Sequence, residues 1–501
     1  MTHRSAWALA LITVIAALIR FLTLGHQSYD HDEAVTAARV LQPGLAGTWN
    51  AVVHGERSPP LYYLLAWVWS KAFGTGAVGL RSLSALFGTL TVPLAYRATV
   101  EFARPRAGLI AAAFVALNPY LVWYSQEARS YALLVLFSTL ALVYFARSLR
   151  SPSRASLALW AVASGLALLS HYFAAFLIGP EAVLLLLASG RRRRTVAAVA
   201  AIAALGLALT PFAVTQEGND RRNGFTQLAV AGRTGETLLN FAASEEPEPF
   251  SGTDWVDLVQ AGAGAGGALL LVLAVGLVAA RGSPEERLGA LALGAVGGAA
   301  LVLPILLAFA GADLLNPRNL IGSVVPLLVV AALGFGAQRA GRAGVVGALA
   351  GCVIFSGVLT AVYASAQMER PDWRGAAEAI GPAAEPRILV VPHNGDDPLA
   401  YYLDAHKLKA PRFPHGLRVR EIDVLSTSYE ITPPGHGFRL VDQEGLAPLF
   451  VLRRFRAVRL ERVRVEQVSG DRVLHERSSA LVDARGEREA SAARGASVAP
   501  G

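Results

Sequence analysis

Cysteine is nearly absent from this chain, and so are the motifs that depend on it. The one cysteine, Cys352, lies in a late apolar run. A single thiol can neither close an internal disulfide nor supply a thiolate cluster for zinc. Paired histidines at zinc-binding spacing, a Walker-type phosphate loop and a Gly-x-Gly-x-x-Gly turn after a strand are missing as well. These absences exclude a disulfide framework, a thiolate metal site and the common nucleotide-binding loops.

Charged residues are scarce too. Only 16% of the 501 residues are Asp, Glu, Lys or Arg, whereas 53% are hydrophobic and the mean hydropathy is +0.43. Such a chain has more apolar surface than one water-soluble core can bury. Apolar runs of about 17 to 25 residues recur, and each is long enough to cross a hydrocarbon core of roughly 30 Å as a helix. The sequence therefore predicts a polytopic α-helical membrane protein.

Arginines between the apolar runs determine the predicted topology. Arginine-rich turns stay in the cytoplasm, and placing all of them on one side predicts eleven spanning helices. The predicted spans cover residues 6–24, 80–98, 106–123, 131–148, 155–171, 173–189, 195–213, 258–280, 288–309, 319–336 and 343–363. We interpret the first as a retained anchor, because it lacks the small-residue cleavage site of a signal peptide.

Residues 59–74 form an aromatic-rich segment that the same argument keeps out of the bilayer core. A full crossing here would move the arginine run 191–194 to the outer side. We therefore expect a juxtamembrane helix on the outer face, started by Pro59 and Pro60, where missing amide donors matter least. An ordinary spanning helix is the alternative.

The more polar parts of the chain are expected on the extracytoplasmic side of the cell membrane. Two outer loops, 25–79 and 214–257, interrupt a membrane domain of residues 1–365. Residues 366–483 are predicted to form a small α/β domain, with a helix at 373–380, a buried strand at 387–392 and exposed strands over 450–468. The last residues, 484–501, have the composition of a disordered tail.

An acidic cluster in the first outer loop is the main candidate site. Asp30, Asp32 and Glu33 follow the first span directly, and Arg57 comes later in the same loop. Carboxylates are costly near lipid, so a group of them at a helix exit indicates a functional site.

Further polar residues gather on the predicted outer face, while the inner face receives mostly arginines. The outer residues are Arg81, Glu127, Arg129, His171 and Arg318. This asymmetry indicates that chemistry takes place at the outer boundary of the membrane.

Four motifs, taken in order, resemble a known family. Asp32-Glu33 is followed by Arg57-Ser-Pro-Pro-Leu-Tyr-Tyr, by Arg81-Ser-Leu-Ser-Ala-Leu-Phe-Gly, and by Asn118-Pro-Tyr-Leu-Val-Trp-Tyr-Ser-Gln-Glu-Ala-Arg-Ser-Tyr. This order resembles the family 39 glycosyltransferases, which include protein O-mannosyltransferases and the aminoarabinose transferases of lipid A. The resemblance spans residues 6–365 and is weak or absent beyond them. It implies a GT-C membrane fold, a sugar donor linked to a polyprenyl phosphate, a catalytic base at Asp32, and no required metal or other cofactor. Asp30 and His31 precede the Asp-Glu pair here, so a bound cation is the alternative that the residue types leave open.

The chemistry can also be argued from the residue types. Moving a sugar from a phosphate to a hydroxyl needs a carboxylate that takes the acceptor proton and cations that hold the departing phosphate. Asp32, with Glu33 beside it, supplies the carboxylate. Arg81, Arg129 and Arg318 supply planar cations that suit a phosphate. A single carboxylate suffices for transfer with inversion.

The other outer residues, Asp30, Arg57, Glu127 and His171, are candidate substrate contacts. His171 has a simpler alternative as a hydrogen-bonded residue at a helix end. Glu127 could form only a local ion pair with Arg129, and surface pairs contribute little.

The proposed catalytic residues have simpler alternatives as well. Asp32 could cap a short helix that starts at Glu33, and Glu33 could merely complement the dipole of that helix. Arg81 and Arg318 could extend toward lipid headgroups.

The sequence thus predicts an inverting glycosyltransferase of the cell membrane with its active site outside. Its expected partners are the bilayer, a polyprenyl-phosphate-linked sugar and an acceptor protein, lipid or envelope glycan; nucleic acid is not among them. The sugar could be a hexose, a pentose or an amino sugar. A non-catalytic GT-C-like scaffold of envelope assembly is one alternative. A transporter is another, although it should show pseudo-symmetric halves with charge at midplane.

Overall fold

The chain divides into two compact units in the computed structural model. The structure describes residues 2–189, 192–217, 230–244, 254–312, 314–382, 386–409, 413, 416–428, 430–446 and 449–482. The membrane unit comprises Met1–His26, Val40–Glu246 and Gly252–Ser365, and the C-terminal unit comprises Gln27–Arg39, Pro247–Ser251 and Ala366–Gly501. The predicted tail 484–501, and residues 218–229 and 245–253 of the predicted loop 214–257, lie outside the described residues.

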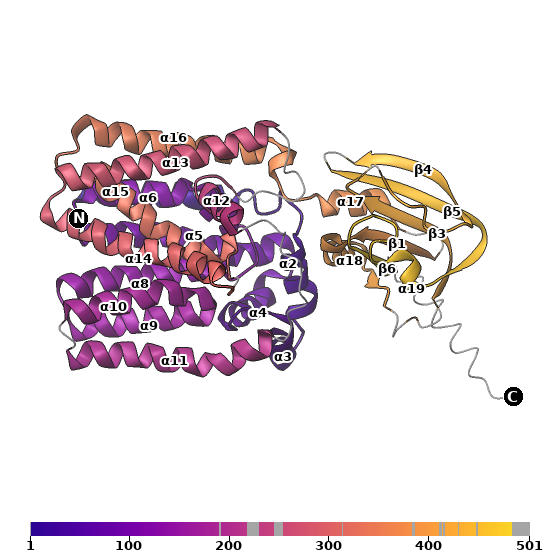
Figure 1. Ribbon diagram of the computed structural model, residues 1–501, viewed down its shortest axis with the longest axis horizontal. Helices are drawn as coiled ribbons and strands as arrows, with labels where there is room; N and C mark the ends of the chain where they lie inside the picture. The colour runs from indigo at the N-terminus through magenta and orange to yellow at the C-terminus, as the bar shows by residue number, and fades with distance from the viewer. Residues whose placement is uncertain are drawn as a thin grey trace. The chain divides into compact units, whose positions relative to one another are not determined.

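Long apolar helices lie side by side in the membrane unit (Figure 1). Within the described ranges, eight helices are long and apolar enough to span a bilayer, one further span is bent, and two shorter apolar helices accompany them, eleven segments in all. The helices are α1 (His3–Phe21), α5 (Ala77–Val100), α6 (Pro105–Leu117) with α7 (Pro119–Ser125), α8 (Tyr131–Arg150), α9 (Arg154–Ser170), α10 (Ala175–Ala188), α11 (Arg193–Glu217), α13 (Asp254–Arg281), α14 (Pro284–Phe309), α15 (Val324–Gly336) and α16 (Gly341–Ala364). Two 3-10 turns, η2 (Tyr172–Ala174) and η3 (Pro317–Ser323), precede α10 and α15. Each predicted span overlaps one of these eleven segments, so the predicted fold class is confirmed.

A buried arginine stabilises the bend between α6 and α7. The two helices meet at 57°, because Pro119 disfavours helical geometry at Asn118. Carbonyl groups at the end of α6 therefore lose their helical donors. Arg20 of α1 replaces those donors, since its Nη2 donates to the carbonyl of Val115 and its Nη1 to that of Ala116, each at 3.0 Å. The bend sets the direction in which the chain enters the turn that precedes α8.

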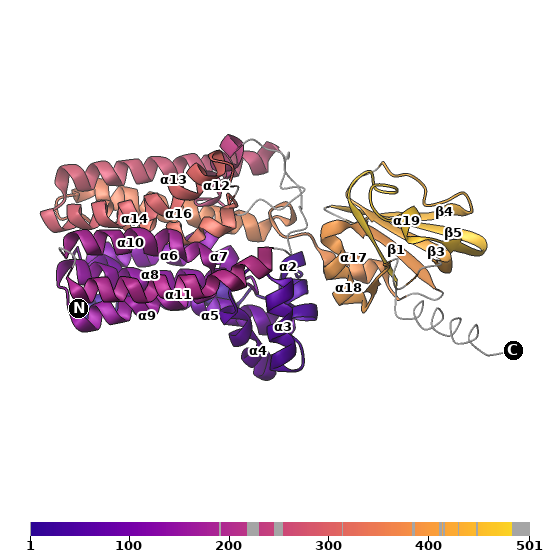
Figure 2. The ribbon, with the colours of Figure 1, turned by 60° about the horizontal axis from the view of Figure 1, so that its bottom comes forward.

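Three shorter helices lie at one end of the bundle. They are α3 (Leu45–Gly55), α4 (Leu61–Phe73) and α12 (Val230–Asn240), and Figure 2 shows α3 and α4 together. α4 has 13 residues and is only about 20 Å long, which is too short to cross a bilayer by itself; α15 has the same length but forms a 20-residue span, Pro317–Gly336, together with η3. The Trp69 indole on α4 donates to Ser82 of α5 at 2.9 Å. The shortness of α4 and its hydrogen bond to α5 agree with the expectation of a juxtamembrane segment.

The C-terminal unit is built on a six-stranded sheet with the order β2-β6-β1-β3-β5-β4. The strands are β1 (Arg387–Pro392), β2 (His406–Lys407), β3 (Leu417–Ser426), β4 (Phe438–Leu446), β5 (Phe450–Val463) and β6 (Ser478–Val482). The short helices of this unit are α2 (His31–Val35), the π-turn η1 (Thr36–Val40), η4 (Ala366–Met368), α17 (Trp373–Ile380), η5 (His393–Gly395), α18 (Asp396–Leu403) and α19 (Val465–Val468). β1 runs parallel to β3, and the other pairs are antiparallel.

The side chains of β1 alternate between two apolar cores, one on each face of the sheet. Ile388 and Val390 pack on one face of the sheet, with Val468 of α19, while Leu389 packs on the other, with Trp373 of α17. Side chains on a strand alternate between faces, so an uninterrupted apolar run indicates a strand covered on both sides. The structure has the predicted helix and strand at 373–380 and 387–392. The predicted exposed strands over 450–468 differ in part, because β5 begins buried and the last four residues form α19.

A buried ion pair joins β1 to β3. The guanidinium Nη1 of Arg387 lies 3.0 Å from Oδ2 of Asp423, and both side chains are almost fully buried. Arg387 also donates to the carbonyl of Ile380 at the end of α17. One arginine therefore connects two strands and the helix that covers them.

We predict that Asp423→Ala destabilises the C-terminal unit by about 3–5 kcal/mol, because it leaves the Arg387 guanidinium buried without this carboxylate. Hydrogen exchange of β1 and β3 amides in the full chain measures the effect. Glu421→Ala is the matched control on the same strand; it removes a pair with the exposed Arg456 and should cost less than about 1 kcal/mol. Equal losses in both variants would contradict the assignment.

The same pair predicts a pH dependence. Burial raises the pKa of Asp423 to about 6, although the Arg387 charge acts in the opposite direction. The folded state then binds the proton more tightly than the unfolded state, so the contribution of Asp423 to stability falls as the pH rises from about 4 to about 6. The stability of wild type relative to Asp423→Asn should decline by up to about 1.4 kcal/mol per pH unit across this window. Hydrogen exchange at both ends of the window measures it, and parallel curves for the two proteins would refute the shift.

Candidate active site

The predicted acidic cluster lies on a segment of the C-terminal unit. Asp30 is the N-cap of α2, and its backbone amide donates to Oε2 of Glu33 at 3.2 Å. Glu33 is fully buried, whereas Asp32 is half-buried in the first turn. The alternative reading of Asp32 as the helix cap is wrong, because Asp30 occupies that position. Glu33 has a structural task at the helix start, and Asp32 is the more accessible carboxylate of the two.

Three side chains form a buried cluster in the membrane unit. Nη1 of Arg129 lies 2.9 Å from Oε2 of Glu56, and the Tyr63 hydroxyl donates to the same oxygen at 2.5 Å. Arg129 belongs to the turn between α7 and α8, Glu56 follows α3, and Tyr63 lies on α4. The Tyr63 hydroxyl and the Arg129 guanidinium therefore both bind the Glu56 carboxylate, which fixes the position of the guanidinium. In water-poor surroundings such a pair keeps its geometry because moving either charge away is costly.

Two of the predicted arginines lie near His171. The imidazole of His171 is buried in the turn between α9 and η2, and it interacts electrostatically with both Arg129 and Arg318. Its Nδ1 accepts a hydrogen bond from the Phe173 amide at 3.3 Å, which is the helix-end role foreseen for it. Its ring also packs against Tyr131. Three separate turns of the bundle therefore bring two guanidinium groups and an imidazole into one region.

The remaining predicted residues of the membrane unit, Arg57, Arg81 and Glu127, differ in how far their side chains are buried. Arg81 is buried in α5, and its Nη1 donates to the carbonyl of Leu24 at 3.0 Å. Glu127 is buried in the same turn as Arg129, and Arg57 is exposed after α3. Arg81 is thus fastened to the end of the first span, and does not extend to lipid headgroups.

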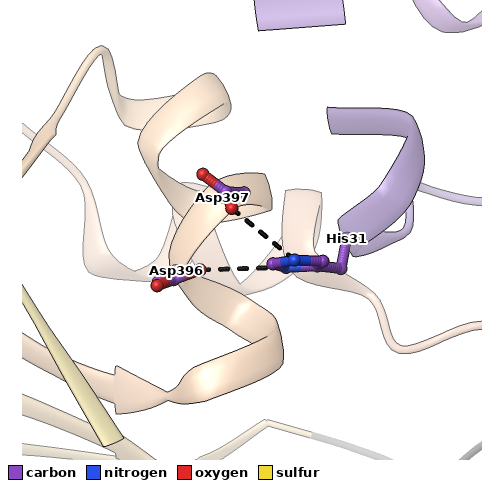
Figure 3. A group of neighbouring side chains, drawn as sticks. All are labelled: His31, Asp396 and Asp397. Carbon is purple, nitrogen blue, oxygen red and sulfur yellow. Dashed lines mark ion pairs between the residues drawn. The ribbon is translucent and has the colours of Figure 1, made fainter. Parts of the chain in front are cut away.

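A second acidic group lies beside the first in the C-terminal unit. Figure 3 shows His31 of α2 directed at Asp396 and Asp397 of α18. His31 Nδ1 lies 3.8 Å from Asp396 Oδ1, and His31 Nε2 lies 3.6 Å from Asp397 Oδ2. These three residues could in principle bind a metal ion. However, Lys407 contacts both carboxylates and Arg39 contacts Asp397, so two positive charges already balance the site.

Several of these residues escaped the sequence analysis. Glu56 directly precedes the recognised Arg57 motif, and its place before that motif was the available signal. Asp396 and Asp397 lie in a region where no family motif pointed to them. Arg20 sits within an apolar run, where a lone intramembrane arginine is itself an indicator of a buried partner.

We predict that Glu56→Ala lowers the stability of the membrane unit by about 3–5 kcal/mol, since it removes the carboxylate that pairs with buried Arg129. Glu56→Gln keeps an acceptor for Tyr63 and should lose less. The midpoint of thermal unfolding in detergent measures both variants. Glu285→Ala is the control, because its contact with Arg150 is exposed and worth at most about 1 kcal/mol. A stable Glu56→Ala protein would argue against the cluster.

Comparisons with known proteins identify the fold of the chain. The family described as dolichyl-phosphate-mannose-protein mannosyltransferase matches residues 57–215, a range that includes Arg81, Arg129 and His171. No curated protein matches the chain. The structure of ArnT from Cupriavidus metallidurans in the apo state is similar with a TM-score of 0.57 at 15% identity, covering 90% of this chain and 98% of ArnT. The structure of the same protein bound to undecaprenyl phosphate gives a TM-score of 0.54 at 13% identity with the same coverage.

The resemblance noted in the sequence is thereby confirmed: the chain has the GT-C membrane fold, and residues 57–215 match the mannosyltransferase family.

Proposed function

We propose that the protein is a membrane glycosyltransferase that moves a sugar from a polyprenyl phosphate to an acceptor on the extracytoplasmic side, with inversion at the sugar carbon. The observation that carries the proposal is that the turns carrying His171 and Arg318 pack together in a bundle with this fold, with Arg129 also within electrostatic reach of His171. Cations grouped at helix ends suit a phosphate ester that enters from the lipid. The ArnT structure with undecaprenyl phosphate supports this class of donor.

The proposed reaction needs one base and one leaving group. Asp32 takes the proton of the acceptor hydroxyl as its oxygen bonds to the anomeric carbon of the sugar. The bond from that carbon to the phosphate oxygen breaks at the same time, and the electron pair leaves with the polyprenyl phosphate. An aspartate with a pKa near 3.9 is ionised at neutral pH and can act as this base. Attack from the face opposite the phosphate gives inversion.

Arginines hold the phosphate in this proposal. Arg129 and Arg318 bind its oxygens, and Arg81 contributes from α5. Guanidinium groups stay charged and can bind two oxygens at once, so they stabilise the negative charge that grows on the leaving phosphate. Glu56 keeps Arg129 in place, as the 2.9 Å contact indicates.

The acceptor side is assigned to other parts of the chain. Glu33, Asp30, Arg57, Glu127 and His171 remain candidate contacts for sugar or acceptor. The loop 214–257 and the C-terminal unit are proposed to shape the acceptor site. A non-catalytic scaffold would not need Asp32, which makes this residue the discriminating one.

We predict that Asp32→Asn lowers transfer by about 10²–10⁴-fold, the usual contribution of a general base, and leaves donor binding unchanged. The measurement is transfer from a panel of radiolabelled polyprenyl-phosphate hexoses, pentoses and amino sugars in acceptor-rich native membranes. Binding of the same donors to purified protein is measured in parallel. Asp404→Asn, an exposed position in the same unit, is the control and should behave as wild type.

Two results would count against the proposal. Normal turnover in an Asp32→Asn protein that binds donor would remove the assigned base. Wild-type protein that transfers none of the sugars to native membranes would favour the scaffold.

A further inference from the structure

The segment that carries Asp32 is fastened to the C-terminal unit before α2 begins. The Ser28 hydroxyl donates to the carbonyl of Pro371 at 2.8 Å and accepts from the Trp373 amide at 3.1 Å. The Tyr29 amide donates to the hydroxyl of Tyr402 on α18 at 2.8 Å. These contacts fix the backbone three and four residues ahead of the proposed base, Asp32.

A second fastening lies at and after α2. His31 faces both carboxylates of the α18 pair, and Arg39 forms an ion pair with Asp397. Lys407 of β2 contacts Asp396 and also Asp397, the latter at 3.1 Å. Asp32 therefore lies in a segment that contacts the start of α17 through Ser28, and α18 through Tyr29 and His31 before it and Arg39 after it.

The acidic pair is buried, so its charges are not easily screened. Asp396 is 1% exposed and Asp397 is 5% exposed. Burial alone would raise the pKa of Asp396, but the Lys407 ammonium and the Ser479 hydroxyl hold that pKa below its usual value. Two carboxylates thus face two permanent cations, with the His31 ring between the two helices. Removing one of these buried carboxylates would leave Lys407, whose side chain is only 17% exposed, without one of its two partners.

We propose that Asp397 is a positioning residue, which through Arg39 and His31 holds α2 at the orientation in which Asp32 acts as base. Lys407 of β2 supports Asp397 by contacting both it and Asp396 on α18. This inference rests on the proposed function of Asp32. It adds to that function a specific task for α18, a helix outside the region that matches the mannosyltransferase family.

The expected signature is a fall in kcat with little change in KM for the donor. Positioning of a base affects the transition state, and displacements near 1 Å can cost about 10²-fold in rate. The donor phosphate is assigned to arginines of the membrane unit, so its binding should not respond. A purely structural defect would instead lower the amount of folded protein and leave kcat per folded molecule unchanged.

The test compares Asp397→Asn, Arg39→Gln and the double variant in full-length protein. We expect each single variant to lose about tenfold in kcat and the double variant to lose no more than the larger single loss, since both act through one contact. In an Asp32→Asn background, Asp397→Asn should cause no further loss. Tyr402→Phe removes the hydroxyl that accepts the hydrogen bond from Tyr29 and is a milder second variant, with an expected loss of about threefold. Asp404→Asn at the end of α18 is the matched control, because it makes the same chemical change at an exposed position.

Hydrogen exchange gives a readout that does not depend on activity. Asp397→Asn should speed exchange of the amides of residues 31–40 and leave those of β1 and β3 unchanged. Faster exchange with full kcat would overturn the positioning role while leaving the function of Asp32 intact. Normal turnover in Asp32→Asn would instead overturn the proposed function, whatever the exchange shows.

Two other outcomes would overturn the inference. A further tenfold loss on adding Asp397→Asn to Asp32→Asn would show that Asp397 acts independently of the base. Stoichiometric binding of Zn²⁺ or Mn²⁺ to wild-type protein, lost in His31→Ala and measured by equilibrium dialysis, would make the cluster a metal site instead.

Discussion

The absence of water from the bilayer core is the constraint on which the membrane unit depends. Every backbone amide and carbonyl within it must find a partner inside the protein, so the chain crosses as helices. Where a helix must break, a substitute donor is required. Arg20 is that donor at the end of α6, and its charge is tolerated because two carbonyl groups and the Ser125 hydroxyl surround it. The bend it supports brings Arg129 into the turn where Glu56 meets it.

Buried charged side chains elsewhere in the protein also need partners. Three groups of buried carboxylates are each paired with cations: Glu56 with Arg129, Asp423 with Arg387, and the acidic pair of α18 with Lys407 and Arg39. Such sets add little net stability, but they fix geometry because breaking one is costly. They tie elements that are distant in sequence, which is what assembling a site from separate turns and strands requires.

The sequence predicted what depends on composition and local pattern. Hydropathy and arginine placement located the eleven apolar segments, and the apolar run at 387–392 located β1, because both signals are carried by neighbouring residues. The ordered motifs indicated the fold that the comparison with ArnT confirms. The sequence could not show that residues 27–39 cluster with the C-terminal unit, since His31 and Asp396 are joined only by folding. It also offered Asp32 as a helix cap, because Asp favours that position, whereas in the structure the helix starts two residues earlier and Asp30 is the cap.

The attachment of residues 27–39 to the C-terminal unit has a consequence for biosynthesis. Ribosomes add about 5–20 residues per second, so the helix that carries Asp32 emerges tens of seconds before α18 exists. During that time the bundle can insert and pack while this acidic segment lacks its final neighbours. A chain truncated before Asp396 would keep the helices of the bundle and would lack every contact that α18 makes with residues 27–39. The acidic segment therefore reaches its folded surroundings only after residues 396–403 have been made.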